Sequence, residues 1–144
     1  MFFRRSRAMT MAMDEFLEEV LRSAEVSGPA QAPQPINLLL NRWYSDQERT
    51  VTLRRMLLRC LSHLQTEHAV LVSEAHRRQF YFELQRKRND PYLVCAILKG
   101  LAGIEDKDAI PFILPLAEEH RSAAAFPQIQ AAARECLIKL GYFG

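Results

Sequence analysis

Three acidic residues stand close together in the second half of the chain, where they could support acid–base or metal chemistry. They are Glu105, Asp106 and Asp108. Neighbouring carboxylates can share a proton or hold a cation when a fold brings them together. The same residue types are favoured at the start of a helix, where unpaired N–H groups and the helix dipole attract negative charge. Because an apolar helical pattern follows them directly, the sequence favours this structural role.

The four histidines are not spaced for a common metal site; they are His63, His68, His76 and His120. A helix that holds both His63 and His68 turns them about 140° apart, so they cannot converge on one ion. The chain also contains no G-x-S-x-G, P-loop, G-x-G-x-x-G or H-E-x-x-H motif. We therefore predict no catalytic residue, no cofactor and no metal ligand, and we do not expect an enzyme.

Basic residues are the remaining candidates for a function. The net charge of +2 is small for a dedicated nucleic-acid binder. The basic excess lies in residues 1–88, where Phe80, Tyr81 and Phe82 are interleaved with cations, a mixture that can contact phosphates and bases. The alternative is a solvated basic face over buried aromatic rings. The candidate nucleic-acid-binding residues are Arg54, Arg55, Arg59, Arg77, Arg78, Arg86, Lys87 and Arg88.

Cysteine usage and hydropathy indicate the compartment. Cys60, Cys95 and Cys136 are too few and too far apart for a disulfide framework or a zinc ribbon, and each falls in an apolar helical pattern. No apolar run is long enough to cross a membrane. The basic N-terminus has no apolar segment after it, so it does not resemble a secretory signal. We expect a cytoplasmic protein.

The elements that would position these residues begin with an N-terminal region, residues 1–35. Apolar side chains recur at helical spacing over residues 12–26, with acidic residues on the opposite face. We expect this amphipathic helix to dock on its own chain; the alternative is that it mediates contact with another subunit. Residues 27–35 hold three prolines and a glycine and form a linker, the one candidate domain boundary.

Residues 36–144 show the spacing of an all-α domain, with about seven helices in the whole chain. A short helix over 36–44 is followed by Ser45-Asp46-Gln47-Glu48, which has capping-box spacing and predicts a helix start at Ser45. Residues 65–72 are expected to form a connector before a helix from Ser73. Asp90-Pro91 predicts the next helix start, with a C-cap at Gly103.

The later helices are bounded by the same kinds of signal. A helix is expected from about Lys107, with Pro115 inside it, and another from Pro127 to Gly141. Three of the predicted helices also repeat one another, because residues 56–64 align with 96–104 and then with 132–140. Each segment carries a small residue followed by leucine, with an aliphatic residue three positions later, a pattern suited to close stacking of similar units.

The chain resembles HEAT repeats, especially the short bacterial kind, in the block from Ile97 to Ile113. This block looks like the end of that family's second helix, an acidic turn and a proline-bearing first helix. The resemblance covers about residues 73–140 and extends more weakly to 46–64. It implies an α-α superhelix, a right-handed stack of helix pairs with an N-terminal helical cap.

The same resemblance implies a non-catalytic protein–protein interaction or scaffold module. Nucleic-acid binding is the alternative, although Arg59 aligns with Lys99 and then with Glu135, so the basic column reverses its sign in the last unit. A HEAT-like enzyme, such as a bilin lyase or a DNA glycosylase, is a remote alternative. Self-association through residues 12–26 or the C-terminal end also stays open. The surface of the second helices supplies the candidate partner-binding residues Arg55, Arg59, Lys99, Arg134 and Lys139.

Overall fold

The computed structural model describes residues 35–45, 50–86, 90–118 and 127–142, together with Glu19 and Arg22. All regular secondary structure in these ranges is helical, which confirms the all-α prediction. The predicted helix 12–26 and the linker 27–35 lie almost wholly outside the described residues. The helices are α2 (Ile36–Ser45), α3 (Val51–Ser62), the 3₁₀ helix η2 (Thr66–Leu71), α4 (Glu74–Gln85), α5 (Pro91–Gly103), the 3₁₀ helix η3 (Lys107–Ala109), α6 (Ile110–Ala117) and α8 (Pro127–Lys139).

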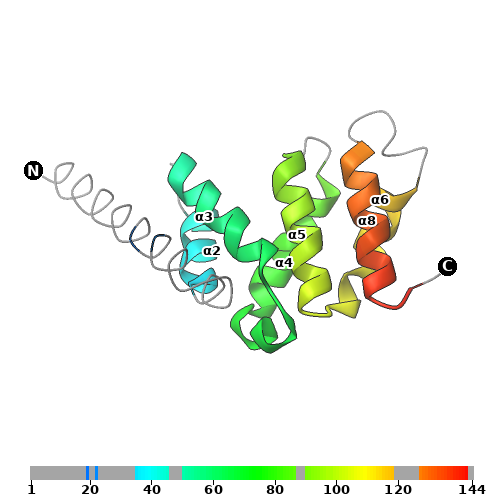
Figure 1. Cartoon of the computed structure of the whole chain (residues 1–144), viewed down its shortest axis with the longest axis horizontal. Coiled ribbons are helices and arrows are strands. Elements are labelled where there is room, and N and C mark those ends of the chain that lie inside the picture. The colour runs from blue at the N-terminus through cyan, green and yellow to red at the C-terminus, as the bar shows by residue number, and fades with distance from the viewer. Residues whose placement is uncertain are drawn as a thin grey trace, which may run out of the picture.

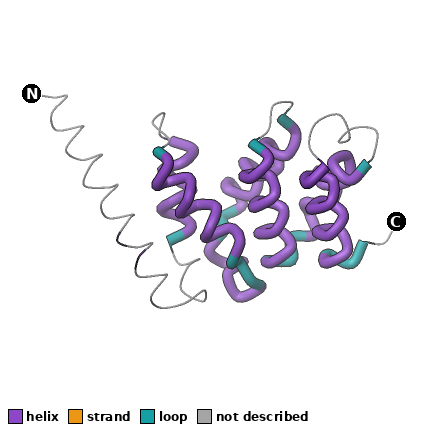
Figure 2. The backbone as a smooth tube through the Cα atoms, turned by 45° about the horizontal axis from the view of Figure 1, so that its top comes forward, coloured by secondary structure: helices purple, strands orange, loops and turns teal. Residues whose placement is uncertain are grey.

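The described α-helices form two layers. Figure 1 shows α3, α5 and α8 side by side in one layer, all running in the same direction, with α2, α4 and α6 behind them. Successive helices pair across the layers as α2 with α3, α4 with α5 and α6 with α8. Figure 2 shows the same pairs from a second direction. The fold therefore places the three aligned segments, 56–64, 96–104 and 132–140, in one layer.

The aligned small residues lie where neighbouring helices approach each other. A Cβ atom at Gly100 would stand 3.1 Å from both the Leu61 carbonyl oxygen and the Leu64 Cδ1. Cys136 is buried, and its Sγ donates to the Leu98 carbonyl oxygen at 3.2 Å. Cys60 is also buried in the core. The predicted packing role of the three small residues is thus visible in the contacts between α3, α5 and α8.

One predicted helix start is wrong and another is confirmed. Ser45 does not open a helix: it is the last residue of α2, and its Oγ donates to the Asn41 carbonyl oxygen. The helix after it begins at Val51 with Thr50 as its N-cap, whose Oγ1 accepts from the Leu53 N–H at 3.1 Å. The capping-box prediction fails because the Ser45 hydroxyl bonds back to a carbonyl within α2, and the Thr50 hydroxyl caps the next helix instead. Asp90 caps α5, with Pro91 in its first turn, as predicted.

The end of α5 differs from the prediction by one residue, for a physical reason. The helix includes Gly103, and the left-handed position falls on Glu105, with φ of 56°. The Asp106 N–H then donates to the Leu101 carbonyl oxygen at 3.0 Å, which closes a Schellman turn. Gly103 is needed for space instead, since a Cβ there would lie 2.0 Å from the Leu64 carbonyl oxygen.

Most of the remaining predicted boundaries are confirmed, but the helix expected from Lys107 starts as the 3₁₀ helix η3 and becomes α-helical only from Ile110. Ser73 caps α4 after the 3₁₀ connector, and its Oγ accepts from the His76 N–H at 3.2 Å. Pro115 lies inside α6. The last helix opens at Pro127 and is closed by Gly141, which has a positive φ of 84°. These helices share one hydrophobic core that runs from Ile36 to Leu140.

Candidate interaction surface

The predicted partner-binding residues all lie on the layer of α3, α5 and α8, whose solvent-facing side we call the α3–α5–α8 surface. Arg55, Lys99, Arg134 and Lys139 are exposed, and Arg59 is half-buried. Two large apolar side chains at the helix starts are also exposed: Val51 on α3, at 83%, and Tyr92 on α5, at 68%. The layer therefore presents cations together with exposed apolar groups, and the sequence analysis had not selected Val51 or Tyr92.

A shallow cleft of about 50 Å³ lies between α5 and α8. Lys99 and Lys139 both line this cleft. Arg134 does not line it, because it lies about 100° around α8 from Glu135, which does. Glu135 also lines the cleft and pairs with Lys139, with 3.4 Å between Oε1 and Nζ. Ligand pockets usually reach several hundred Å³. The cleft is therefore a surface feature of the layer with a mixed charge.

A cluster of three basic side chains lies where α3 meets α5. Arg59 and His63 are four residues apart on α3, and the next helix contributes Lys99. Burial lowers the pKa of His63, and the charges of Arg59 and Lys99 lower it further. The Arg59 Nε is buried, and no hydrogen-bond partner is found for it among the described residues. We call Arg59, His63 and Lys99 the basic cluster.

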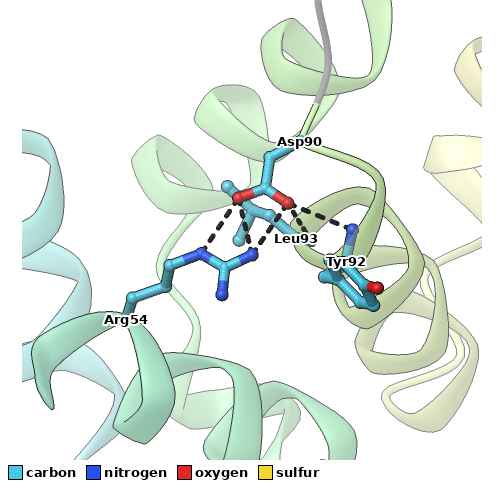
Figure 3. A network of polar contacts seen from close by, with 4 residues as sticks. All are labelled: Arg54, Asp90, Tyr92 and Leu93. Atoms are coloured by element: carbon cyan, nitrogen blue, oxygen red, sulfur yellow. Dashed lines mark hydrogen bonds and ion pairs between the residues drawn. The ribbon is translucent and has the colours of Figure 1, made fainter. Parts of the chain in front are cut away.

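Arg54, by contrast, is held in a structural role (Figure 3). Its guanidinium forms two-point hydrogen bonds with the Asp90 carboxylate, at 2.8–3.0 Å, and lies over the Tyr92 ring at 5.8 Å. The same carboxylate accepts from the Tyr92 and Leu93 N–H groups at 3.1 and 3.3 Å, which caps α5. Asp90 therefore joins the helix start of α5 to α3 through Arg54.

Arg77 is also structural, and it overturns the predicted role of Asp106. The Asp106 side chain makes no capping hydrogen bond. It is buried, accepts from the Tyr81 hydroxyl and lies 3.8 Å from the Arg77 Nη1. Arg77 also donates to the carbonyl oxygens of Ala69 and Val72 at 2.9 and 3.2 Å. Arg77, Tyr81 and Asp106 together join η2, α4 and the turn after α5. The buried carboxylate of Asp106 requires such partners, because an unpaired buried charge is destabilising.

The phenol of Tyr81 shows the effect of this environment. Burial raises the pKa of Tyr81, and the hydrogen bond to Asp106 and the nearby charge of Asp108 raise it further. Its ring stacks on Phe112 at 4.6 Å, which joins α4 to α6. Phe80 is buried. Of the three aromatic residues predicted for base stacking, Phe82 alone is exposed, at 69%.

The other predicted nucleic-acid-binding residues on α4 and its end are paired or lie outside the described residues. Arg78 pairs with Glu74 at 2.9 Å, and Arg86 pairs with the buried Glu83 at 3.1 Å. Lys87 and Arg88 are outside the described residues. Among the described members of the predicted set, Arg55 and Arg59 belong to the α3–α5–α8 surface, and Arg54, Arg77, Arg78 and Arg86 pair with carboxylates.

Two other described histidines, His68 and His76, serve local structure. The His68 Nδ1 accepts from the Gln65 N–H at 2.9 Å, and the His76 Nε2 lies 2.9 Å from the Asn41 Oδ1, which links α4 to α2. His120 lies outside the described residues. Within the described ranges, no three His, Cys, Asp or Glu side chains are arranged to hold a metal ion. In the same ranges no helix has the length and apolar character needed to span a bilayer.

None of the three cysteines, all of which lie in the described residues, forms a disulfide, and burial disfavours the thiolate of two of them. Burial raises the pKa of Cys60 and of Cys136 to about 12. Burial also raises the pKa of the half-buried Cys95. Because the thiolate is the reactive form, these raised pKa values indicate a packing role for the cysteines.

Comparison with protein-family models, with curated proteins and with solved structures gives no match for this chain.

Proposed function

We propose that this chain is a non-catalytic protein-binding or scaffold module of the HEAT-like kind, and that its partner contacts the α3–α5–α8 surface. The observation that carries the proposal is the division of the basic residues. Arg54, Arg77, Arg78 and Arg86 are paired with carboxylates, whereas Arg59, His63 and Lys99 of the α3–α5–α8 surface form a cluster of basic groups. Exposed Tyr92 and Val51 add apolar area, and tyrosine with arginine is typical of the centre of protein interfaces.

The stacked helix pairs and the sequence resemblance together support a HEAT-like α-α superhelix as the architecture. In such a stack the second helix of each pair lies in one layer, which here corresponds to α3, α5 and α8. The three cysteines that form no disulfide support a cytoplasmic location, since a reducing compartment preserves buried thiols. Residues 12–26 are proposed to cap the stack at its first helix pair.

Nucleic-acid binding receives less support as a function. A surface that follows a phosphate backbone needs a continuous row of cations. On this layer the row ends at α8, where Glu135 lies beside Lys139. On α4, the described arginines face their own acidic partners.

Capture of a partner from native lysate tests the proposed function. The immobilised full-length chain is compared with its Lys99→Glu variant and with Arg78→Glu, a matched charge reversal on α4. We expect the wild type and the Arg78→Glu variant to retain the same protein, and Lys99→Glu to lose it. Equal retention by all three, or no retained protein in any of them, would overturn the proposal.

A further inference from the structure

The basic cluster lies at a point where α3 and α5 are held unusually close. Gly100 and Gly103 both contact the end of α3, because a Cβ at either position would stand 2.0–3.1 Å from the Leu61 or Leu64 carbonyl oxygen. Lys99 immediately precedes one of these glycines, and His63 immediately precedes Leu64. The glycine contacts therefore fix the end of α5 against the residues that follow α3, in the region that holds Lys99 and the C-cap residue His63.

The cluster has donors but no acid of its own. The charged groups that act on His63 are Arg59 from its own helix and Lys99 from α5, and both are positive. The Arg59 Nε has lost contact with water and has no acceptor among the described residues. Burial of the Nε holds the guanidinium against the protein, so an incoming acceptor would meet the other N–H groups of Arg59, which are not among the buried unpartnered atoms.

We propose that Arg59, His63 and Lys99 form a seat for a carboxylate of an acidic segment in the protein partner, and that seating the carboxylate is coupled to protonation of His63. This inference rests on the proposed function and names the chemistry of its partner. Arg59 and Lys99 supply charge-assisted hydrogen bonds, which are stronger than neutral ones. Protonated His63 supplies a third cation.

Several features favour a short carboxylate segment over a phosphate backbone. The seat comprises three groups on two helices, and the next helix presents Glu135, which lines the cleft that Lys99 also lines. An extended polyanion that continued from Lys99 toward α8 would meet this carboxylate. A short acidic stretch can end before it, with an apolar neighbour placed against the exposed ring of Tyr92.

The direction of the proton coupling follows from the charges. In the free protein, burial and two cations hold the pKa of His63 below its usual value of 6.5. A carboxylate placed beside His63 raises that pKa, so the complex takes up a proton as pH falls. Binding is therefore tighter at pH 5.5 than at pH 7.5, while glutamate side chains stay largely ionised. If the anion raises the pKa of His63 by about one unit, the Kd falls by about fivefold across this range.

The test uses a rhodamine-labelled octaglutamate peptide as the probe and fluorescence anisotropy at low salt. We expect the full-length chain to bind it more tightly at pH 5.5 than at pH 7.5. The His63→Gln variant should still bind but lose the pH dependence, Arg59→Gln and Lys99→Gln should weaken binding at both pH values, and Arg78→Gln should match the wild type. No binding, or unchanged pH dependence in His63→Gln, would overturn the proposal.

Two further measurements keep the test decisive. In the wild-type chain, NMR titration of the His63 ring should show its pKa rising when octaglutamate is added, and an unchanged pKa would overturn the coupling without relying on a variant that could misfold. An octauridine probe that binds more tightly than octaglutamate, and loses binding in Lys99→Gln, would contradict the choice of carboxylate. Failure of the proposed function is distinguishable, because lysate capture can fail while octaglutamate still shows the His63-dependent pH effect.

Discussion

Two arginines one layer apart, Arg77 and Arg59, show how the fold assigns different roles to similar side chains. Arg77 extends from α4 toward buried Asp106 and two backbone carbonyl oxygens, so its donors are used inside the protein. Arg59 lies on α3, where its neighbours are the basic groups His63 and Lys99 and its buried Nε has no acceptor in the described ranges. A nearby carboxylate, which the sequence pattern does not reveal, therefore distinguishes the structural Arg77 from Arg59, which we propose to contact a partner.

Removal of the acid beside Arg77 should produce the largest effect on stability. In the Asp106→Ala variant the half-buried Arg77 loses its carboxylate partner, and the Tyr81 hydroxyl loses its acceptor. We expect the free energy of unfolding to fall by about 2–3 kcal/mol, because one partner of a largely buried polar network is removed. Chemical denaturation monitored by circular dichroism measures this loss. A decrease below about 1 kcal/mol would show that Arg77 and Asp106 do not carry the structural role assigned to them.

Removal of the acid beside Arg54 should have an intermediate effect. The Asp90→Ala variant loses both the N-cap of α5 and the half-exposed ion pair, so we expect about 1–2 kcal/mol of destabilisation. Asp90→Asn keeps a capping oxygen and should recover about half of this. A double-mutant cycle with Arg54→Gln separates the two contributions, and equal loss in the Ala and Asn variants would contradict the assigned capping role.

Neutralisation of the basic cluster should have the smallest effect on stability. Lys99→Gln is expected to change the free energy of unfolding by less than about 0.5 kcal/mol, since an exposed side chain without a buried contact contributes little. The same variant should lose partner binding. Denaturation and lysate capture are measured on one preparation, and a loss of stability as large as that of Asp106→Ala would erase the distinction between the two regions.

Thiol reactivity offers a small, independent check of the layer's packing. Cys60 and Cys136 hold their thiols in the neutral form because burial raises their pKa to about 12, whereas Cys95 is only half-buried. At pH 8, iodoacetamide should label Cys95 first, as followed by mass spectrometry of tryptic peptides. Early labelling of Cys136 would indicate that α8 does not stay packed on α5.

The sequence was sufficient for features that depend on local chemistry. Ser73, Asp90, Pro127 and Gly141 were placed correctly because capping and helix-ending preferences act within a few residues. The aligned small residues also predicted close helix contacts, since each must fit beside the same kind of neighbour.

Other features depend on distant contacts and could not be predicted from spacing. Asp90 meets Arg54 across 36 residues, and Asp106 meets Tyr81 across 25, so their partners become visible only when the helices pair. The sequence predicts Gly103 as a helix C-cap, but the glycine is needed there because the Leu64 backbone leaves no room for a side chain. The basic cluster is partly predictable. The aligned segments mark Arg59 and Lys99 as candidate partner-binding residues, whereas the sequence gives no sign that His63 lies beside them.

Site-specific photo-crosslinking tests the central claim most directly, because the chain offers two exposed aromatic residues on opposite layers. Tyr92 on α5 and Phe82 on α4 are exposed to 68% and 69%. Each is replaced in turn by p-benzoyl-phenylalanine, and the two proteins are irradiated in native lysate. We predict a specific crosslink to a partner from position 92 and none from position 82. A partner crosslinked from position 82 but not from 92 would contradict binding at the α3–α5–α8 surface.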